Sequence, residues 1–375
     1  MKHPSHLGGR LCVLAVALST AAASAQLAKG QCKFLGNIIT NSVPSDYNTY
    51  WNQASPENSG KWSSIQSSVK STSYNWSGFD VVYKWGQTTG NPVKFHTLVW
   101  GSQQPSDASS ATLADIKKWF EAVHTRYPDV AQIDVVNEAY SSHAPAQYRN
   151  ALKNAASQYG VQSGEYDWIF VAFKMARELW KDPAKTELIY NDFNTIEYDG
   201  ENNWQVNMAK AAKAQKIPID AIGLQAHDAY KLSTSSVKAK IDKIAAEGIP
   251  LYVTEYDIGE TDNTKQKNIM AEQMTMFWNH PNIKGVTYWG LRDGQTWRTG
   301  TGIFTSGGQP RPSMTWLIDW IPKNQAKCLS DIEARPAVAT TPKPSGLIMK
   351  NIDGRLVAGV EREGKFVAVS ALGKN

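Results

Sequence analysis

The chain has 375 residues, of which 42% are hydrophobic, and it carries a formal net charge of +5. This length allows two or three ordinary domains or one large α/β barrel, and the hydrophobic fraction is enough for a sizeable core. Lysine and arginine are scattered along the chain and form no basic stripe, so we expect no nucleic-acid partner.

Residues 1–25 have the three parts of a secretory signal peptide. Lys2 and Arg10 supply positive charge, residues 11–18 (LCVLAVAL) form a short apolar run, and the A-S-A sequence at 23–25 offers a cleavage site. The apolar run is too short to span a membrane, and no other segment is apolar enough to do so. We therefore expect a secreted protein, extracellular or at the cell surface, without a membrane span.

Short apolar runs alternate with longer segments whose apolar residues recur every three or four positions. The longer segments, at 113–127, 166–180, 237–249 and 265–278, are typical of amphipathic helices, and the short runs of buried strands. Strands that alternate with helices predict a parallel sheet, and eight of them favour an α/β fold of the (β/α)8 TIM barrel type, which we assign to residues 26–334. A glycine-rich dinucleotide fingerprint and metal-ligand spacings are absent from the sequence, so we expect no cofactor and no metal. The eight expected strands lie at 34–40, 50–57, 93–100, 132–139, 187–194, 221–227, 251–258 and 283–290.

The composition changes near residue 335. The segment RPAVATTPKPSG at 335–346 is rich in Pro, Thr and Ala, which predicts a linker. Residues 347–375 have alternating apolar positions interrupted by two glycine turns, which predicts a short β-rich extension of two or three strands, too few for an independent core. This tail could sort or anchor the protein, be a truncated binding module, or be a processed extension.

Polar side chains follow six of the predicted strands at their C-terminal ends, which form the mouth of a TIM barrel, where active sites are built. Glu138 ends the fourth strand and Glu255 lies in the seventh, so the two carboxylates face each other across the mouth. Hydrolysis of a glycosidic bond needs such a pair, one protonated to assist the leaving oxygen and one ionised to meet the oxocarbenium-like carbon. The alternative is that Glu138 simply ends a strand in solvent.

The chain resembles glycoside hydrolase family 10, the retaining endo-β-1,4-xylanases, in seven ordered motifs: ENSGKW (57–62), HTLVWGSQ (96–103), DVVNEA (134–139), YNDFN (190–194), GLQAH (223–227), TEYDI (254–258) and YWGLRD (288–293). The resemblance implies that xylan and xylo-oligosaccharides are the substrates, that Glu138 is the acid/base and that Glu255 is the nucleophile. It also implies a set of substrate-binding side chains, with Asp257 behind one of them, His227. That set comprises Glu57, Asn58 and Lys61 on the glycone side, His96, Trp100, Gln103 and Asn137 around the reacting sugar, Gln225 and His227 beside the nucleophile, and Trp289 and Trp297 as aromatic cover.

Several positions depart from the family pattern. Gly101 stands where His is common, Ser106 and Asp107 stand where an aromatic residue is frequent, Phe193 replaces the usual Tyr, and Tyr256 stands where Leu is common. These positions belong to the rim and to the leaving-group side. They therefore bear on chain length and side-chain preference and leave the expected chemistry intact.

Two other functions share part of this pattern. A β-1,4-glucanase would use the same mechanism and would differ only in contacts near Gln103 and Trp297, because xylose lacks the 5-hydroxymethyl group of glucose. A non-catalytic carbohydrate-binding barrel would account for the 14 Trp and 15 Tyr residues, whose rings stack on sugars or fill cores, but it would not need both glutamates. In each case we expect a monomer.

Two of the three cysteines lie outside the predicted signal peptide. Cys32 precedes the first expected strand and Cys328 follows the last expected helix, and a closed barrel brings these two ends together. In an exported protein a pair of cysteines oxidises readily. We therefore predict a Cys32–Cys328 disulfide with Cα atoms about 4.4–6.8 Å apart; the alternative is two buried free thiols.

Overall fold

The computed structural model describes residues 26–140, 143, 145 and 148–329, together with the backbone of residues 348–352, 355–362 and 365–368. The predicted signal peptide (1–25) and the predicted linker (335–346) lie outside the described residues. The chain divides into two units, one ending at Cys328 and the other beginning at Leu329.

The first unit is built around one sheet of eight strands in the order β2-β1-β8-β7-β6-β5-β4-β3, with neighbouring strands parallel. A parallel bridge between Ala54 of β2 and Val93, next to β3, links the two ends of this order. The sheet is therefore a nearly closed barrel, which confirms the predicted TIM-barrel fold. Each predicted run contains one strand: β1 (Phe34–Ile39), β2 (Gln53–Pro56), β3 (Lys94–Val99), β4 (Gln132–Asn137), β5 (Glu187–Asp192), β6 (Ala221–Leu224), β7 (Leu251–Tyr256) and β8 (Ile283–Tyr288).

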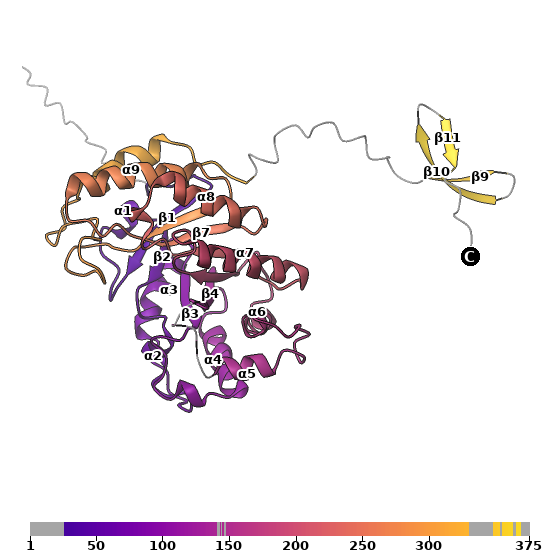
Figure 1. Ribbon diagram of the computed structural model, residues 1–375, viewed down its shortest axis with the longest axis horizontal. Coiled ribbons are helices and arrows are strands. Elements are labelled where there is room, and N and C mark those ends of the chain that lie inside the picture. Colours follow the sequence, from indigo (N-terminus) through magenta and orange to yellow (C-terminus); the bar gives the residue numbers. More distant parts are fainter. Residues whose placement is uncertain are drawn as a thin grey trace, which may run out of the picture. The chain divides into compact units, whose positions relative to one another are not determined.

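Helices follow the strands along the chain and surround the sheet (Figure 1). The four predicted helices are confirmed as α4 (Leu113–Arg126), α6 (Asp167–Leu179), α8 (Thr234–Ala245) and α9 (Asn263–Asn279). The structure adds helices that the periodicity did not predict. These are α1 (Tyr47–Tyr50), α2 (Trp62–Ile65), α3 (Ser77–Thr89), α5 (Arg149–Asn154), α7 (Asp199–Ala214) and α10 (Pro312–Trp320), with 3-10 turns at η1 (Ala108–Ser110), η2 (Ala229–Lys231) and η3 (Ile321–Lys323).

Helix α4 illustrates why these segments are helical. Its buried residues, among them Ile116, Phe120 and Val123, recur every three or four positions and so form one apolar face. At its start, the Thr112 side chain accepts a hydrogen bond from the amide of Asp115, and the Asp115 carboxylate accepts one from the amide of Thr112. This capping box satisfies amides that the first turn leaves without helical partners.

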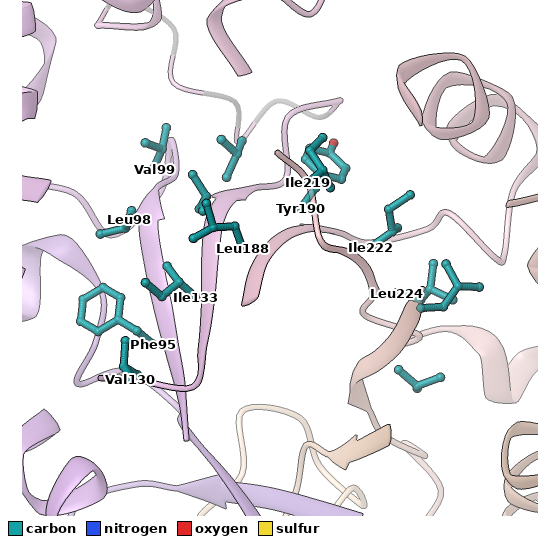
Figure 2. Packing of buried hydrophobic residues seen from close by; sticks show 14 of the residues in the cluster. Phe95, Leu98, Val99, Val130, Ile133, Leu188, Tyr190, Ile219, Ile222 and Leu224 are labelled. Carbon is teal, nitrogen blue, oxygen red and sulfur yellow. The ribbon is translucent and has the colours of Figure 1, made fainter. Parts of the chain in front are cut away.

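The core lies on both faces of the strands, because a barrel strand is covered by the interior on one side and by helices on the other. All six residues of β3, β4 and β7 are buried. Figure 2 shows Phe95, Leu98 and Val99 of β3 beside Ile133 of β4 and Leu188 of β5. This packing explains why the strands read as nearly continuous apolar runs.

The predicted disulfide is present between Cys32 and Cys328, with Cα atoms 6.3 Å apart. Cys32 lies just before β1, and Cys328 follows the last turn of the unit, η3. The amide of Ala326 also donates to the Gln31 side chain at 2.9 Å, so the two ends of the barrel are joined by a covalent and a polar contact.

The second unit contains three antiparallel strands in the order β11-β10-β9: β9 (Ile348–Ile352), β10 (Arg355–Arg362) and β11 (Lys365–Ala368). Across the described parts of both units, no helix is long and apolar enough to cross a bilayer.

Candidate active site

A hollow of about 470 Å³ opens at the C-terminal ends of the barrel strands. Of the 14 side chains assigned to the site from the sequence, 12 line this hollow, and Asn137 and Asp257 lie directly behind its wall, as shown by their contacts with lining residues. The lining residues among them are Glu57, Asn58, Lys61, His96, Trp100, Gln103, Glu138, Gln225, His227, Glu255, Trp289 and Trp297.

Glu138 directly follows β4 and is buried. Its φ of 57° lies in the left-handed region, which turns the chain out of the strand. Oxygen Oε2 accepts hydrogen bonds from Trp100 Nε1 at 2.8 Å and lies 2.6 Å from His143 Nδ1, while Oε1 accepts from Gln225 Nε2 at 3.0 Å. The carboxyl is thus fixed from two sides and stays at the wall of the hollow.

Glu255 lies in β7, also buried at the hollow. Its Oε1 accepts from Asn191 Nδ2 at 2.7 Å, and its Oε2 lies 3.2 Å from His227 Nε2. Burial by itself raises the pKa of this carboxyl, but the His227 hydrogen bond and the nearby charges of His96, His227 and Lys94 outweigh burial and hold the pKa well below its usual range. The surroundings of Glu255 therefore favour its ionised form.

His227 connects Glu255 to a second carboxylate. Its Nδ1 lies 3.2 Å from Asp257 Oδ2 on the side opposite Glu255, and Asp257 is fully buried. Burial lowers the pKa of His227, yet the charges and hydrogen bonds of Asp257 and Glu255 together raise it to about 10. The protonated His227 ring thus lies between two carboxylates, Glu255 and Asp257. The Trp297 indole donates to the same Asp257 oxygen at 2.8 Å and so helps to hold that carboxylate in place.

Three amide side chains, Gln225, Asn137 and Asn191, link Glu138 to Glu255. Gln225 Nε2 donates both to Glu138 Oε1 and, at 3.2 Å, to Asn137 Oδ1. Asn191 Nδ2 donates both to Asn137 Oδ1, at 2.8 Å, and to Glu255 Oε1. Since Asn137 Oδ1 accepts both bonds, the Asn137 Nδ2 group faces elsewhere, and it finds no partner among the residues that the structure describes.

Beneath the hollow, the charged groups of β3 and β4 are paired. Asp134 Oδ2 lies 2.8 Å from His96 Nδ1 and 2.9 Å from Lys94 Nζ, and all three residues are buried. Potential ligand atoms of His96, Asp134 and Glu255 also lie within 4.8 Å of one another. The Lys94 ammonium already neutralises the central carboxylate of this group, which disfavours a metal cation there.

One end of the hollow is polar. Lys61 Nζ donates to Asn58 Oδ1 at 2.8 Å and lies 5.0 Å from the centre of the Trp100 ring. Burial lowers the pKa of Lys61, partly offset by the carboxylates of Glu255, Glu57 and Glu138, and burial raises the pKa of Glu57, partly offset by Lys61. A second hollow of about 690 Å³ shares Glu57 and Asn58 with the first and extends the cleft at this end.

Backbone strain is concentrated at this mouth. Five described residues other than glycine have a positive φ, and four of them, Gln103, Glu138, Asn194 and Ala226, follow strands β3 to β6. Each costs roughly 1–3 kcal/mol, and such residues persist mainly where the surrounding structure requires a particular placement. Here the turns direct Glu138 and the Gln225–His227 segment into the hollow.

Besides the assigned residues, the hollow is lined by Ser102, His143, Phe193, Asn194, Asp228 and Arg298, and Asn191 contacts the site from behind. Three of these make contacts that matter for the site. His143, on the connection between β4 and α5, contacts Glu138. Asn191 bonds Glu255 from within β5. Arg298 lines the hollow, donates to the His227 carbonyl at 2.9 Å and lies over the Trp297 ring. Asn191 was recognisable as a polar residue at a strand end, whereas the two loop residues left no periodic signal.

The chain matches the model of glycosyl hydrolase family 10 over residues 17–320. It is 41% identical over 294 residues to endo-1,4-beta-xylanase B of Cellvibrio japonicus. The matched region covers 76% of this chain and 45% of that protein. It is 27% identical over 278 residues to endo-1,4-beta-xylanase 3 of Hypocrea jecorina, covering 71% of this chain and 74% of that one. The chain thus spans less than half the length of the Cellvibrio relative.

Solved structures with the same fold include xylanase 10B from Thermotoga petrophila in complex with xylobiose, with a TM-score of 0.66, 25% identity and coverage of 84% of this chain and 99% of that one. Native xylanase 10B from Thermotoga maritima also has a TM-score of 0.66, with 26% identity and coverage of 82% and 98%.

Proposed function

Because the chain belongs to glycosyl hydrolase family 10, we propose that it cleaves internal β-1,4-xylosidic bonds of xylan by a retaining double displacement. Glu138 serves as acid/base and Glu255 as nucleophile. The observation that carries this proposal is the pair of buried carboxylates in one hollow, where Gln225 donates to Glu138, Asn191 donates to Glu255, and both amides also donate to Asn137. One of them, Glu255, is also kept ionised by its surroundings.

In the first step the ionised Glu255 attacks the anomeric carbon, and Glu138 donates its proton to the leaving glycosidic oxygen. The bond to the leaving group breaks as the bond to the Glu255 oxygen forms. The protonated His227 steadies the Glu255 charge before attack, and Asn191 fixes Oε1, so the carboxylate needs little reorganisation at the moment of reaction. The product is a covalent glycosyl-enzyme and a shortened chain.

In the second step a water molecule attacks the same carbon, and Glu138, now ionised, accepts the water proton. The Trp100 and Gln225 hydrogen bonds, which persist in the ionised form, support the carboxylate in this basic role. Two inversions at one carbon leave the β-configuration unchanged. This mechanism requires the Glu138 and Glu255 carboxyls to be about 5–5.5 Å apart.

The sugar contacts follow from the unused polar groups. The Asn137 Nδ2 group is available to donate to the 2-hydroxyl of the reacting sugar, a contact that strengthens in the transition state. Glu57, Asn58 and Lys61 offer charged and amide groups to the next sugar on the glycone side. The Trp289 ring completes the wall beside His96, 5.6 Å between ring centres.

We place this activity outside the cytoplasm, as the signal-like residues 1–25 indicate. The Cys32–Cys328 disulfide supports an oxidising compartment. Among substrates, xylan is favoured over β-1,4-glucan by the xylanases to which the chain is similar.

The test is hydrolysis by the purified protein of xylan, cellulose and mixed-linked β-glucan, with Glu255→Gln as the inactive reference and Asp319→Asn, on the exposed side of α10, as the matched control. We expect new reducing ends and xylo-oligosaccharides from xylan alone, with the Asp319 variant equal to the wild type. Activity on the glucans alone would show that the protein is a β-1,4-glucanase. Binding to xylan without hydrolysis would show that it is a non-catalytic carbohydrate-binding protein.

A further inference from the structure

Large hydrophobic side chains that remain exposed gather at the mouth of the barrel. In the described part of the chain, four are more than a third exposed: Val81, Tyr140, Tyr198 and Trp297. Val81 lies on α3, whereas Tyr140 follows β4, Tyr198 lies between β5 and α7, and Trp297 follows β8. Exposed aromatic rings are normal singly, but their concentration around one cleft indicates a binding surface.

The Tyr140 ring is held in place although it is 43% exposed. Its ring centre lies 5.4 Å from that of Trp204 on α7, and the Trp204 indole is itself anchored by a 2.6 Å hydrogen bond to Glu165. The Tyr140 amide donates to Asp192 Oδ2 at 3.3 Å, which ties the residue to the end of β5. One side of the ring is therefore packed and the rest faces solvent.

Tyr198, 48% exposed, lies at the same place on the fold. It is the residue before the first turn of α7, and its amide donates to the Asn194 carbonyl at 2.9 Å. A Cβ added at Gly200, two residues further on, would lie 3.5 Å from the Tyr140 hydroxyl. The two tyrosines therefore share the N-terminus of α7, four residues along the chain from Asn194 at the wall of the hollow.

The mechanism indicates which part of the substrate lies near Tyr140 and Tyr198. The general acid protonates the oxygen of the leaving group, so the leaving chain extends from Glu138 over the loops that follow β4 and β5. Trp297 belongs to the opposite side, since its indole bonds Asp257 and its ring lies 4.7 Å from that of His227, next to the nucleophile. Aromatic rings thus flank the two carboxylates at both ends.

We propose that Tyr140 and Tyr198 form a sugar-stacking surface that binds xylosyl units of the leaving-group side, beyond the unit next to Phe193. Phe193 lines the hollow itself and is followed directly by Asn194, from which the chain leads to Tyr198. This inference rests on the proposed function. Because pyranose rings present C–H groups on their faces, an aromatic ring binds them without needing a specific hydroxyl pattern.

The tyrosine surface affects the binding of long substrates and leaves the bond-breaking step unchanged. Within the part of the chain that the structure describes, Glu138 contacts Trp100, Gln225 and His143, and neither tyrosine is among its hydrogen-bond partners. Stacking therefore contributes only when a substrate has enough units on the leaving-group side to reach the tyrosines. The expected effect is a change in which bond of an oligosaccharide is cut.

The experiment compares Tyr140→Ala, Tyr198→Ala and the double variant with Tyr140→Phe, which keeps the ring, and with Val81→Ala, an exposed hydrophobic residue away from the mouth. Xylohexaose carrying ¹⁸O at its reducing end is digested, and mass spectrometry reports which bond is cleaved. Rates for xylotriose and an aryl β-xylobioside are measured in parallel, and melting temperature checks folding.

For the alanine variants we expect kcat/KM on xylohexaose to fall about five-fold, the equivalent of one aromatic contact, with cleavage shifting toward the reducing end. Rates on xylotriose and the aryl xylobioside should change less than two-fold, and the Phe and Val81 variants should match the wild type. An unchanged cleavage pattern in both single variants, or an equal loss on the aryl xylobioside, would overturn the inference. A wild-type protein inactive on all three substrates would instead refute the proposed function.

Discussion

The charge on His227 depends on Asp257, and Asp257→Asn tests this dependence. The substitution keeps the size of the side chain but removes a buried negative charge 3.2 Å from His227 Nδ1. His227 should then lose its proton at a much lower pH. Glu255 in turn loses a positive partner, so the pKa of Glu255 rises.

The magnitude follows from the geometry. Two unit charges 3.2 Å apart interact by about 5 kcal/mol at an effective dielectric constant of about 20. Raising the pKa of His227 from 6.5 to about 10 corresponds to a similar figure, about 5 kcal/mol, shared between Asp257 and Glu255. We therefore expect the His227 pKa to fall by at least about 2 in the variant, so that at pH 8 half or more of the rings have lost the proton that the wild type keeps.

The assay is a ¹³C-histidine NMR titration of wild type and variant, with His124 on α4 as the internal reference, together with kcat/KM for an aryl β-xylobioside between pH 3 and 9. The raised pKa of His227 keeps the ring charged below about pH 10 in the wild type. In the variant the acid limb of kcat/KM, which reports protonation of Glu255, should move to higher pH, and kcat/KM should fall on the order of 10- to 100-fold. A His227 resonance that titrates as in the wild type would refute the reasoning, and Asp319→Asn should leave both readouts unchanged.

Three further predictions concern other contacts. Glu138→Ala should abolish hydrolysis of xylan but spare the first step on an aryl glycoside, whose leaving group needs no proton, and azide should restore turnover; equal loss on both without rescue would indicate a structural role. His143→Ala removes the 2.6 Å contact between His143 and Glu138 and should lower kcat on xylan about five-fold with the melting temperature unchanged. Full activity would show that Trp100 and Gln225 are enough to position Glu138. Replacing Cys32 and Cys328 by Ser opens a loop closed over a separation of 296 residues and should lower the melting temperature by roughly 10 °C by scanning calorimetry, whereas a shift under about 2 °C would show that the termini are held without the bridge.

The strands were predictable from the sequence and several helices were not, for a physical reason. Barrel strands are buried on both faces and therefore read as short apolar runs. Helix α7 (Asp199–Ala214) buries only five of its residues, two of them Asn202 and Gln205, so its periodicity is diluted by polar side chains. Helix α3 begins at Ser77 without a side-chain cap, so the sequence carries no capping signal for its start.

In the site, too, residues at strand ends were predictable from the sequence and contacts made by loops were not. Glu138 and Glu255 were recognisable because each comes at the end of an apolar run that brings it to the mouth. The hydrogen bond from Trp100 to Glu138 and the position of His143 depend on how the loops fold, and sequence spacing carries no record of it. The position of Tyr140 likewise depends on a ring contact with Trp204 across two elements.

The proposed function requires Glu255 to be the nucleophile of a retaining reaction. Incubation of the purified protein with 2,4-dinitrophenyl 2-deoxy-2-fluoro-β-xylobioside slows the second step enough to trap the glycosyl-enzyme, and peptide mass spectrometry locates the sugar. We predict one fluoroxylobiosyl group per chain, attached to Glu255, with loss of activity in proportion to labelling. Attachment to another residue, or an active protein that releases the dinitrophenol yet never carries the sugar, would contradict the account.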